Sequence, residues 1–214
     1  MPLLRRATGA PSRTPIEGQW CRLEPLRLEH APDLYRAAAP ERFTWLFDAM
    51  PRDEAEMVAW VEKAMATSDP LFFAVIDRTT GRAEGRQAFM RIVPEHGVIE
   101  IGNIYWGDAI ARSRVATEAL YLFARHAFEA LGYRRFEWKC NDRNEPSKKA
   151  ARRFGFTYEG TFRQHMIFKG ENRDTAWFAM LDQDWHRVRE AFETWLKDDN
   201  FDAQGQQKAK LRID

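Results

Sequence analysis

The stretch VATEALYLFARHAFEAL, residues 115–131, carries the strongest helical pattern in the chain. Its apolar residues recur every three or four positions, which is the period of one face of a helix. That stripe consists of Ala116, Ala119, Leu120, Phe123, Ala127 and Leu131. Gly132 follows, where a helix C-cap belongs. Tyr121, Leu122 and Phe128 add apolar surface on a second side, so we expect this helix to lie against a sheet and to be covered from more than one direction.

The segments around this helix predict an α/β arrangement. Strand patterns lie at 98–106 and 134–140, and a shorter helix is expected over 144–154. Followed by one more strand, they form a βαβαβ run. The other expected elements are strands at 20–27, 71–77, 86–93, 156–168 and 174–181, and helices at 30–39, 53–65 and 184–196. Residues 41–52 are rich in aromatics but show no period, which predicts a loop.

Composition favours one folded domain in the 214 residues, with hydrophobic residues at 44%. We expect an irregular arm over 1–18, a single domain over 19–198 and a polar, loose tail over 199–214. The 33 basic and 32 acidic residues nearly balance, which argues against a dedicated nucleic-acid binder. The two cysteines are expected to be buried thiols. The N-terminal region shows no apolar run typical of a signal peptide or membrane anchor, so a cytoplasmic location is expected.

The junction before residue 115 is a candidate anion site. A strand–loop–helix junction directs bare backbone N–H groups and the positive end of a helix dipole outward. Arg112 and Arg114 lie there, with Ser113 between them and Thr117 one turn later. Cations at this end oppose the dipole by roughly a few tenths of a kcal/mol each. A polyphosphate gripped by the arginines would resolve that conflict; the alternative is a solvated pair matched by nearby acids.

Several short motifs occur in one order along the second half of the chain. They are 116–120 (ATEAL), 127–129 (AFE), 131–132 (LG), 144–147 (NEPS), 154–156 (FGF), 159–160 (EG) and Arg163. Together they resemble the GNAT superfamily, in particular the branch of the ribosomal-protein N-acetyltransferases RimJ and RimL. The resemblance spans residues 20–183. It implies a GNAT fold, with a mixed, mostly antiparallel sheet of about seven strands, flanked by helices and splayed between 98–106 and 134–140.

The resemblance also implies acetyl-CoA as co-substrate, with no metal, and a primary amine as acceptor, in a peptide N-terminus or a small molecule. The loop and helix start would hold the pyrophosphate, the strand end would pair with the pantetheine arm, and Ser147 would lie near the thioester sulfur. Asn144 would contact the cofactor, or serve only as a helix N-cap. The implied cofactor-binding residues are Ile104, Tyr105, Trp106, Ile110, Ala111, Arg112, Ser113, Arg114, Val115, Ala116, Thr117, Asn144 and Ser147.

Two departures from the family pattern bear on catalysis. Arg112 and Arg114 stand where the family has loop glycines, and Ala151 stands where many relatives have a tyrosine acid. The implied catalytic residues are Glu100 as base, unless it is structural, and Ser147 as the nearest hydroxyl. An acyl-CoA-binding or sensing module without turnover is therefore the alternative to an active transferase.

The acceptor site implied by family analogy lies between the early helices and the late strands. Trp45, Phe47, Arg163 and His165 are its candidate residues, with Phe43, Lys169 and Arg173 nearby. Alternatively, the aromatics belong to the core and the basic residues to a solvated strand face. If they line the cleft, the acceptor has an apolar part and an acidic part. His165 is not expected to bind metal, because no partner ligand lies at a suitable spacing.

One further alternative is a nucleic-acid or ribosome-associated protein that uses a basic run along the chain. The run consists of Arg134, Arg135, Arg143, Lys148, Lys149, Arg152 and Arg153. We expect these residues instead to be solvated faces of a strand and a helix, or to hold the 3′-phosphate of the cofactor. Nucleic acid is therefore an unlikely partner, and the sequence leaves the oligomeric state open.

Overall fold

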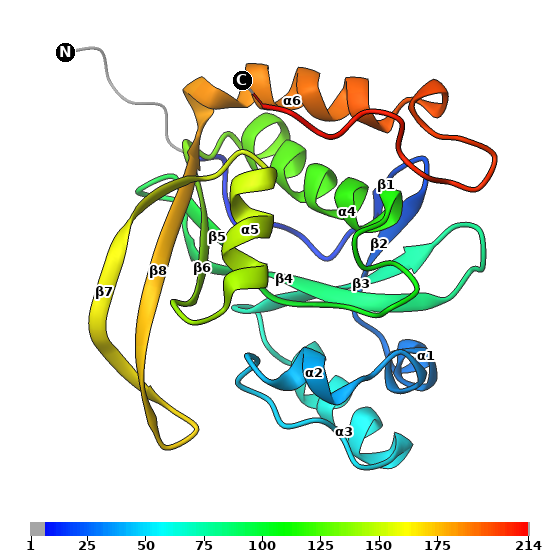
Figure 1. Cartoon of the computed structure of the whole chain (residues 1–214). Helices are drawn as coiled ribbons and strands as arrows, with labels where there is room; N and C mark the ends of the chain where they lie inside the picture. Colours follow the sequence, from blue (N-terminus) through cyan, green and yellow to red (C-terminus); the bar gives the residue numbers. More distant parts are fainter. Residues whose placement is uncertain (1–6, 214) are drawn as a thin grey trace.

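One eight-stranded sheet organises the computed structural model, which describes residues 7–213 (Figure 1). The strands follow the order β1-β2-β3-β4-β5-β6-β8-β7, and only β5 and β6 run parallel. Their bounds are β1 Ile16–Glu17, β2 Cys21–Pro25, β3 Leu71–Asp77, β4 Ala83–Val93, β5 Val98–Trp106, β6 Arg135–Asn141, β7 Thr157–Phe168 and β8 Glu171–Leu181. The mixed, mostly antiparallel sheet is confirmed. The additional strand is β1, which is too short to show an alternating pattern.

Helices cover both faces of the sheet (Figure 1). On one face lie α4 (Arg114–Arg125), α5 (Glu145–Arg153) and α6 (Asp182–Leu196), and on the other α1 (Ala31–Arg36), α2 (Pro40–Phe43) and α3 (Glu54–Met65). Short η1 (Leu28–His30) and η3 (Asp198–Asn200) turns and the π-turn η2 (His126–Ala130) complete the elements. Residues 41–52, expected to be a loop, thus begin inside the short helix α2, whose N1 position is Pro40.

Helix α4 lies at the centre of the larger core. Nine of its residues are buried, and the ring of Phe123 stacks on Phe89 of β4 with 3.8 Å between centroids. The helix expected over 115–131 is confirmed, but only Arg114–Arg125 is α-helical. Residues 126–130 form a π-turn, and Gly132 after it has a φ of +69°. Burial on two sides, expected from Tyr121 and Phe128, is also observed, since both rings contact Trp185 of α6.

Strands β5 and β6 separate partway along their length. They pair from Val98↔Arg135 to Ile101↔Trp138, whereas β5 continues to Trp106. Between its pairs with β4 at Gly102 and at Tyr105, β5 holds one residue more than its partner, and Asn103 has a φ of +49°. Such a bulge bends its strand, and here it lies where β5 leaves β6. The splay expected between these two strands is therefore present.

Two buried apolar residues anchor the C-terminal segment, although residues 202–210 between them are exposed. Phe201 and Leu211 are buried, and the Phe201 ring meets Trp195 of α6 edge to face at 5.0 Å. Asn200 donates from its side-chain amide to the carbonyl oxygen of Trp195 at 2.9 Å. Two isolated apolar residues in a polar stretch form no periodic pattern, so only tertiary packing reveals their role.

Candidate active site

A cavity of about 610 Å³ lies where β5 and β6 part. Its walls come from α2 and the segment after it, from β4, β5, β6, β7 and β8, and from α5 with its N-cap. Nine of the residues proposed from the sequence line it: Trp45, Phe47, Glu100, Ile104, Tyr105, Trp106, Asn144, Ser147 and His165. The lining leaves out Arg163 and the loop and helix start, namely Ile110, Ala111, Arg112, Ser113, Arg114, Val115, Ala116 and Thr117.

The wall formed by α5 presents an amide and a hydroxyl. Asn144 is the N-cap of α5, because its Oδ1 accepts a hydrogen bond from the backbone N–H of Ser147 at 3.1 Å. Its Nδ2 makes no hydrogen bond within residues 7–213. The Ser147 Oγ accepts from Trp138 Nε1–H at 2.9 Å, and the Ser147 hydroxyl also acts as a hydrogen-bond partner of the Cys140 sulfur. Burial raises the pKa of the neighbouring Cys140 thiol, so that group stays protonated at neutral pH.

The opposite wall holds the buried carboxylate of Glu100, which shares a lysine with a second buried carboxylate behind the wall, that of Glu137. Lys139 Nζ lies 2.8 Å from Glu100 Oε2 and 2.6 Å from Glu137 Oε2, and Arg91 Nε reaches Glu100 Oε2 at 3.1 Å. Burial raises the pKa of Glu100, against the attraction of Lys139 and Arg91. Burial also acts on Glu137, but hydrogen bonds from Lys139 and Arg135 outweigh it and lower the pKa of that carboxyl.

Lys139 and Asn103 are site residues that the sequence analysis missed. Arg135, Glu137 and Lys139 alternate with apolar residues along β6, a signal that the strand exposes a charged face. Asn103 gave no comparable signal, because its left-handed φ depends on the register between β4 and β5.

The start of α4 keeps the backbone shape of an anion-binding turn. Ser113 is its N-cap and accepts from the N–H of Ala116 at 3.4 Å. The N–H groups of Arg114 and Val115 belong to the first helical turn and have no acceptor within the helix. Arg112 is exposed and takes a φ of +61°, a conformation that glycine adopts at less cost. The loop thus retains a glycine-like turn although an arginine occupies it.

The side chain of Arg114 is held by the C-terminal segment. Its guanidinium lies 3.3 Å from the ring centroid of Trp20 and 4.2 Å from that of Phe201, and its Nη1 pairs with Asp198 at 3.2 Å. This corrects the expectation that both loop arginines are free to grip phosphate. Arg112 is exposed at the loop surface, where its charge acts on Asp108.

The aromatic candidates of the acceptor region divide into core and cavity residues. Phe43 is buried against Tyr105, with 5.3 Å between ring centroids. Phe47 is 60% exposed, lines the cavity and meets the ring of Phe168 edge to face at 5.2 Å. Trp45 also lines the cavity. The two alternatives for these aromatics are thus both realised, at different positions.

The basic candidates on β7 and β8 divide in the same way. His165 Nδ1 lies 2.9 Å from the Thr175 hydroxyl, and burial together with Arg91, Arg173 and Lys139 lowers the pKa of His165. Arg163 is exposed outside the cavity, contrary to its proposed role. The reason is a bulge between Phe162 and Met166, with Gln164 at a φ of +48°, which breaks the alternation along β7.

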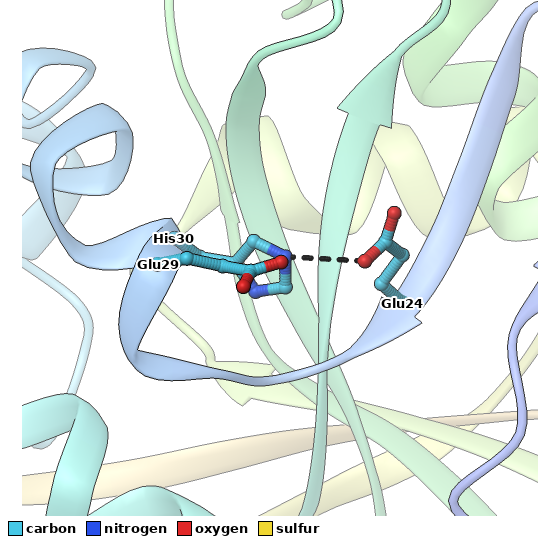
Figure 2. Close-up of side chains that lie close together, drawn as sticks. All are labelled: Glu24, Glu29 and His30. Carbon is cyan, nitrogen blue, oxygen red and sulfur yellow. Dashed lines mark ion pairs between the residues drawn. The ribbon is translucent and has the colours of Figure 1, made fainter.

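A second polar cluster lies away from the cavity, at the end of β2 and in η1 (Figure 2). Figure 2 shows His30 facing Glu24, with 3.4 Å between Nε2 and Oε2, and Glu29 beside them. The His30 Nδ1 accepts from the Arg27 backbone N–H at 3.1 Å, so Nε2 carries the proton. Glu24 is already paired with Arg22 and Arg27. These donors make the cluster an ion-pair network and do not suit a metal site.

Three of the seven residues in the basic run considered for nucleic-acid binding are paired with acids. Arg135 bonds Glu137 and Glu159, Lys148 bonds Glu145 at 2.6 Å, and Arg143 reaches Glu171 at 3.2 Å. These pairs support the interpretation of the run as ordinary strand and helix faces. Within residues 7–213, no helix combines the length and apolar character needed to cross a bilayer.

Comparison with known proteins agrees with this geometry. Residues 21–157 match the acetyltransferase (GNAT) domain. The chain is 51% identical to a GCN5-related N-acetyltransferase from Brucella melitensis, with a TM-score of 0.94 over 96% of this chain and 95% of that one. A GNAT-family protein from Chromobacterium violaceum is 40% identical, with a TM-score of 0.80 over 87% and 96%. No curated protein sequence matches the chain.

A more distant likeness reaches the branch named from the sequence motifs. An acetyltransferase from Salmonella typhimurium that modifies the N-terminal serine of ribosomal protein L7/L12 is 19% identical, with a TM-score of 0.68 over 78% of this chain and 99% of that one. At this identity the likeness is one of fold. The domain match and the two nearer structures carry the assignment, and the chain belongs to the GNAT family of acetyltransferases.

Proposed function

We propose that the protein transfers an acetyl group from acetyl-CoA to a primary amine, in a small molecule or at a peptide N-terminus. Membership of the GNAT family implies the use of acetyl-CoA. The observation that carries the proposal is the cavity at the parting of β5 and β6. It is lined from both faces of the sheet, by Asn144 and Ser147 of α5 and by Phe47 beyond α2. A thioester and an amine can therefore meet inside the sheet from opposite sides.

The carrier would enter along the free edge of β5. Residues Ile104–Trp106 have no partner strand on the β6 side, so their backbone groups are available to the amides of the pantetheine arm. The Nδ2 of Asn144 points to the same cavity and would donate to that arm. The N–H groups of Arg114 and Val115, with the Arg112 guanidinium, would hold the pyrophosphate at the start of α4.

The reaction would be a direct displacement at the thioester carbonyl. The amine nitrogen attacks the carbonyl carbon, the new C–N bond forms and the C–S bond breaks. Glu100 would accept the proton that the amine loses, directly or through one water, and the Ser147 hydroxyl would supply a proton to the departing CoA thiolate. Both groups line the cavity from different walls, which suits separate acid and base roles.

Glu100 suits the role of base better than Glu137. A base works best when its pKa lies near the working pH, and burial raises the pKa of Glu100 while the lysine and arginine contacts lower that of Glu137. Glu100 also lines the cavity. The two carboxyl groups that share Lys139 therefore differ in pKa. The group with the raised pKa, Glu100, suits a base that gains and loses a proton, whereas the group with the lowered pKa, Glu137, suits a carboxylate that stays ionised.

The test is a thiol-release assay with acetyl-CoA and a panel of amines, run beside calorimetry of acetyl-CoA binding. We expect binding, and CoA release that depends on the presence of an amine. Binding without amine-dependent release would contradict turnover and favour the sensing module, which the absence of a tyrosine at Ala151 makes worth testing. Failure to bind acetyl-CoA would contradict both.

A further inference from the structure

Four cationic side chains line the cavity, and one of them has no carboxylate partner. Arg42 pairs with Asp108, and Arg91 and Lys139 both pair with Glu100. Arg173 of β8 forms no ion pair with any of residues 7–213. Its single hydrogen bond in that range runs from Nε to the Thr175 hydroxyl at 3.2 Å. The two terminal nitrogens of its guanidinium therefore remain for a ligand.

Burial makes this position unusual for an unpaired charge. The whole Arg173 residue is only 7% exposed, and a buried charge is costly unless an opposite charge or hydrogen bonds compensate it. The rings of Phe47 and Phe168 lie 5.1 and 5.5 Å from its guanidinium carbon. They provide cation–π attraction but no anion. Arginine keeps its charge in proteins, so an anionic ligand group would complete the site.

The face on which Arg173 lies separates the acceptor from the carrier. The register pairs Lys139 with Trp177 and Asn141 with Thr175. Because side chains alternate along a strand, Arg173 shares the face of Thr175, Trp177 and Lys139. Trp138 occupies the opposite face and bonds Ser147 of α5. Arg173 therefore lies on the sheet face opposite to that of Trp138 and α5. Helix α4, whose start would hold the phosphates of the carrier, lies on the same side of the sheet as α5 (Figure 1).

We propose that Arg173 binds a carboxylate of the acceptor, so that the preferred acceptors are amines that also carry an acidic group next to an apolar one. A guanidinium fork fits a carboxylate in bidentate geometry. Trp45 and the exposed ring of Phe47 line the same cavity and would hold the apolar part. This inference rests on the proposed acetyl transfer, since it names the acceptor class for that same site.

The kinetic test uses acceptor pairs that differ only in the acid: phenylalanine against phenylalaninamide, and Ser-Glu-Phe-amide against Ser-Gln-Phe-amide. We expect the wild type to favour the acidic member of at least one pair by about tenfold or more in kcat/KM. Arg173→Gln should lower that value by about tenfold to a hundredfold, the usual worth of a charge-assisted hydrogen bond. The neutral member should change less than about threefold, and Arg173→Lys should be intermediate. Equal losses on both members, or a wild type without preference, would overturn the inference.

Two controls separate the possible causes of a loss. Acetyl-CoA affinity, measured by calorimetry, should be the same in Arg173→Gln as in the wild type; a loss there would assign Arg173 to the carrier phosphates instead. Arg82→Gln, a matched change in the exposed turn between β3 and β4, should leave both acceptor classes unaffected. Thermal unfolding of all variants shows whether each is folded.

A binding measurement distinguishes failure of this inference from failure of the proposed reaction. Calorimetry with 3-phenylpropionate and the CoA-loaded protein should give binding to the wild type and none to Arg173→Gln. That result without acetyl transfer to any amine would refute the reaction but keep the carboxylate site. Acetyl transfer with no 3-phenylpropionate binding and no acid preference would refute the carboxylate site alone.

Discussion

At the scale of single residues, Lys139 decides how the two carboxylates of the site differ. Glu100 and Glu137 both contact its ammonium group, but Arg135 also bonds Glu137 at 2.6 Å. The better-compensated carboxyl stays ionised, and the more deeply buried one has its pKa raised. The neighbouring strands β5 and β6 thus each supply one carboxyl group, and the two groups differ in pKa.

Replacement of Glu100 tests its role as base. Glu100→Gln should lower kcat by about 10²- to 10⁴-fold, the usual contribution of a general base, with unchanged acetyl-CoA affinity. The wild-type rate should rise with pH as Glu100 loses its proton. Because burial raises the pKa of that carboxyl, the rise should come at a higher pH than for an exposed glutamate. The variant should lack this limb in a pH profile of kcat/KM.

Glu95→Gln is the matched control, since Glu95 is exposed in the turn before β5. Its pH profile should coincide with that of the wild type. If Glu100→Gln retains kcat within about threefold and keeps the same acidic limb, Glu100 is structural and another group takes the proton.

At the scale of elements, the start of α5 has two roles. It caps the helix, and it forms part of the cavity wall. Asn144 uses its oxygen as the N-cap, and we propose that its amide nitrogen donates to the carrier. The two atoms of one amide group therefore have separable tasks. The bulge at Asn103 acts at the same scale, since it lies where β5 parts from β6 and the cavity opens.

Two substitutions separate the tasks of Asn144. Asn144→Asp keeps a cap oxygen but loses the N–H donor, so acetyl-CoA should bind several-fold more weakly while the unfolding free energy stays nearly unchanged. Asn144→Ala loses both, and should cost about 1 kcal/mol of stability as well. Chemical denaturation and calorimetry on the two variants check this. Unaltered acetyl-CoA affinity in Asn144→Asp would show that the residue is only a cap.

At the scale of the whole molecule, the C-terminal segment joins the two ends of the chain at the start of α4. The Arg114 side chain lies between Trp20, near the N-terminus, and Phe201, and pairs with Asp198. A residue in the expected phosphate loop is thereby fixed by elements far away in sequence. The position of this loop therefore depends on the packing of the C-terminal segment against Arg114.

Removal of the Phe201 ring tests how much the packing of the C-terminal segment contributes to stability. Phe201 is 8% exposed and contacts both Trp195 and Arg114, so Phe201→Ala should lower the unfolding free energy by about 3 kcal/mol. The control is Phe162→Ala, whose ring is 53% exposed on β7; it should stay within about 0.5 kcal/mol. Denaturant titrations measure both. Equal effects of the two substitutions would mean that the tail is not part of the cooperative fold.

The sequence by itself was sufficient for the family, for the strands other than β1, for the α-helices other than α2, and for the long helix after the expected phosphate loop. Those features depend on local periodicity and on short motifs, which one chain displays without its partners. The sequence was also sufficient to propose nine of the residues that line the cavity. The motifs implied that β5 and β6 separate, and strand ends and helix starts meet at that place.

Only the tertiary structure decided which charges are free. Arg114 and Arg173 are both arginines near aromatic residues, yet Arg114 is paired with Asp198, whereas Arg173 forms no ion pair within residues 7–213 and feels Glu100 only at longer range. The bulge that removes Arg163 from the cavity and the burial of Phe201 likewise follow from register and packing between distant segments. Ion pairs and burial depend on contacts between residues that are far apart in the chain, and the pattern of neighbouring residues in a sequence does not show these contacts.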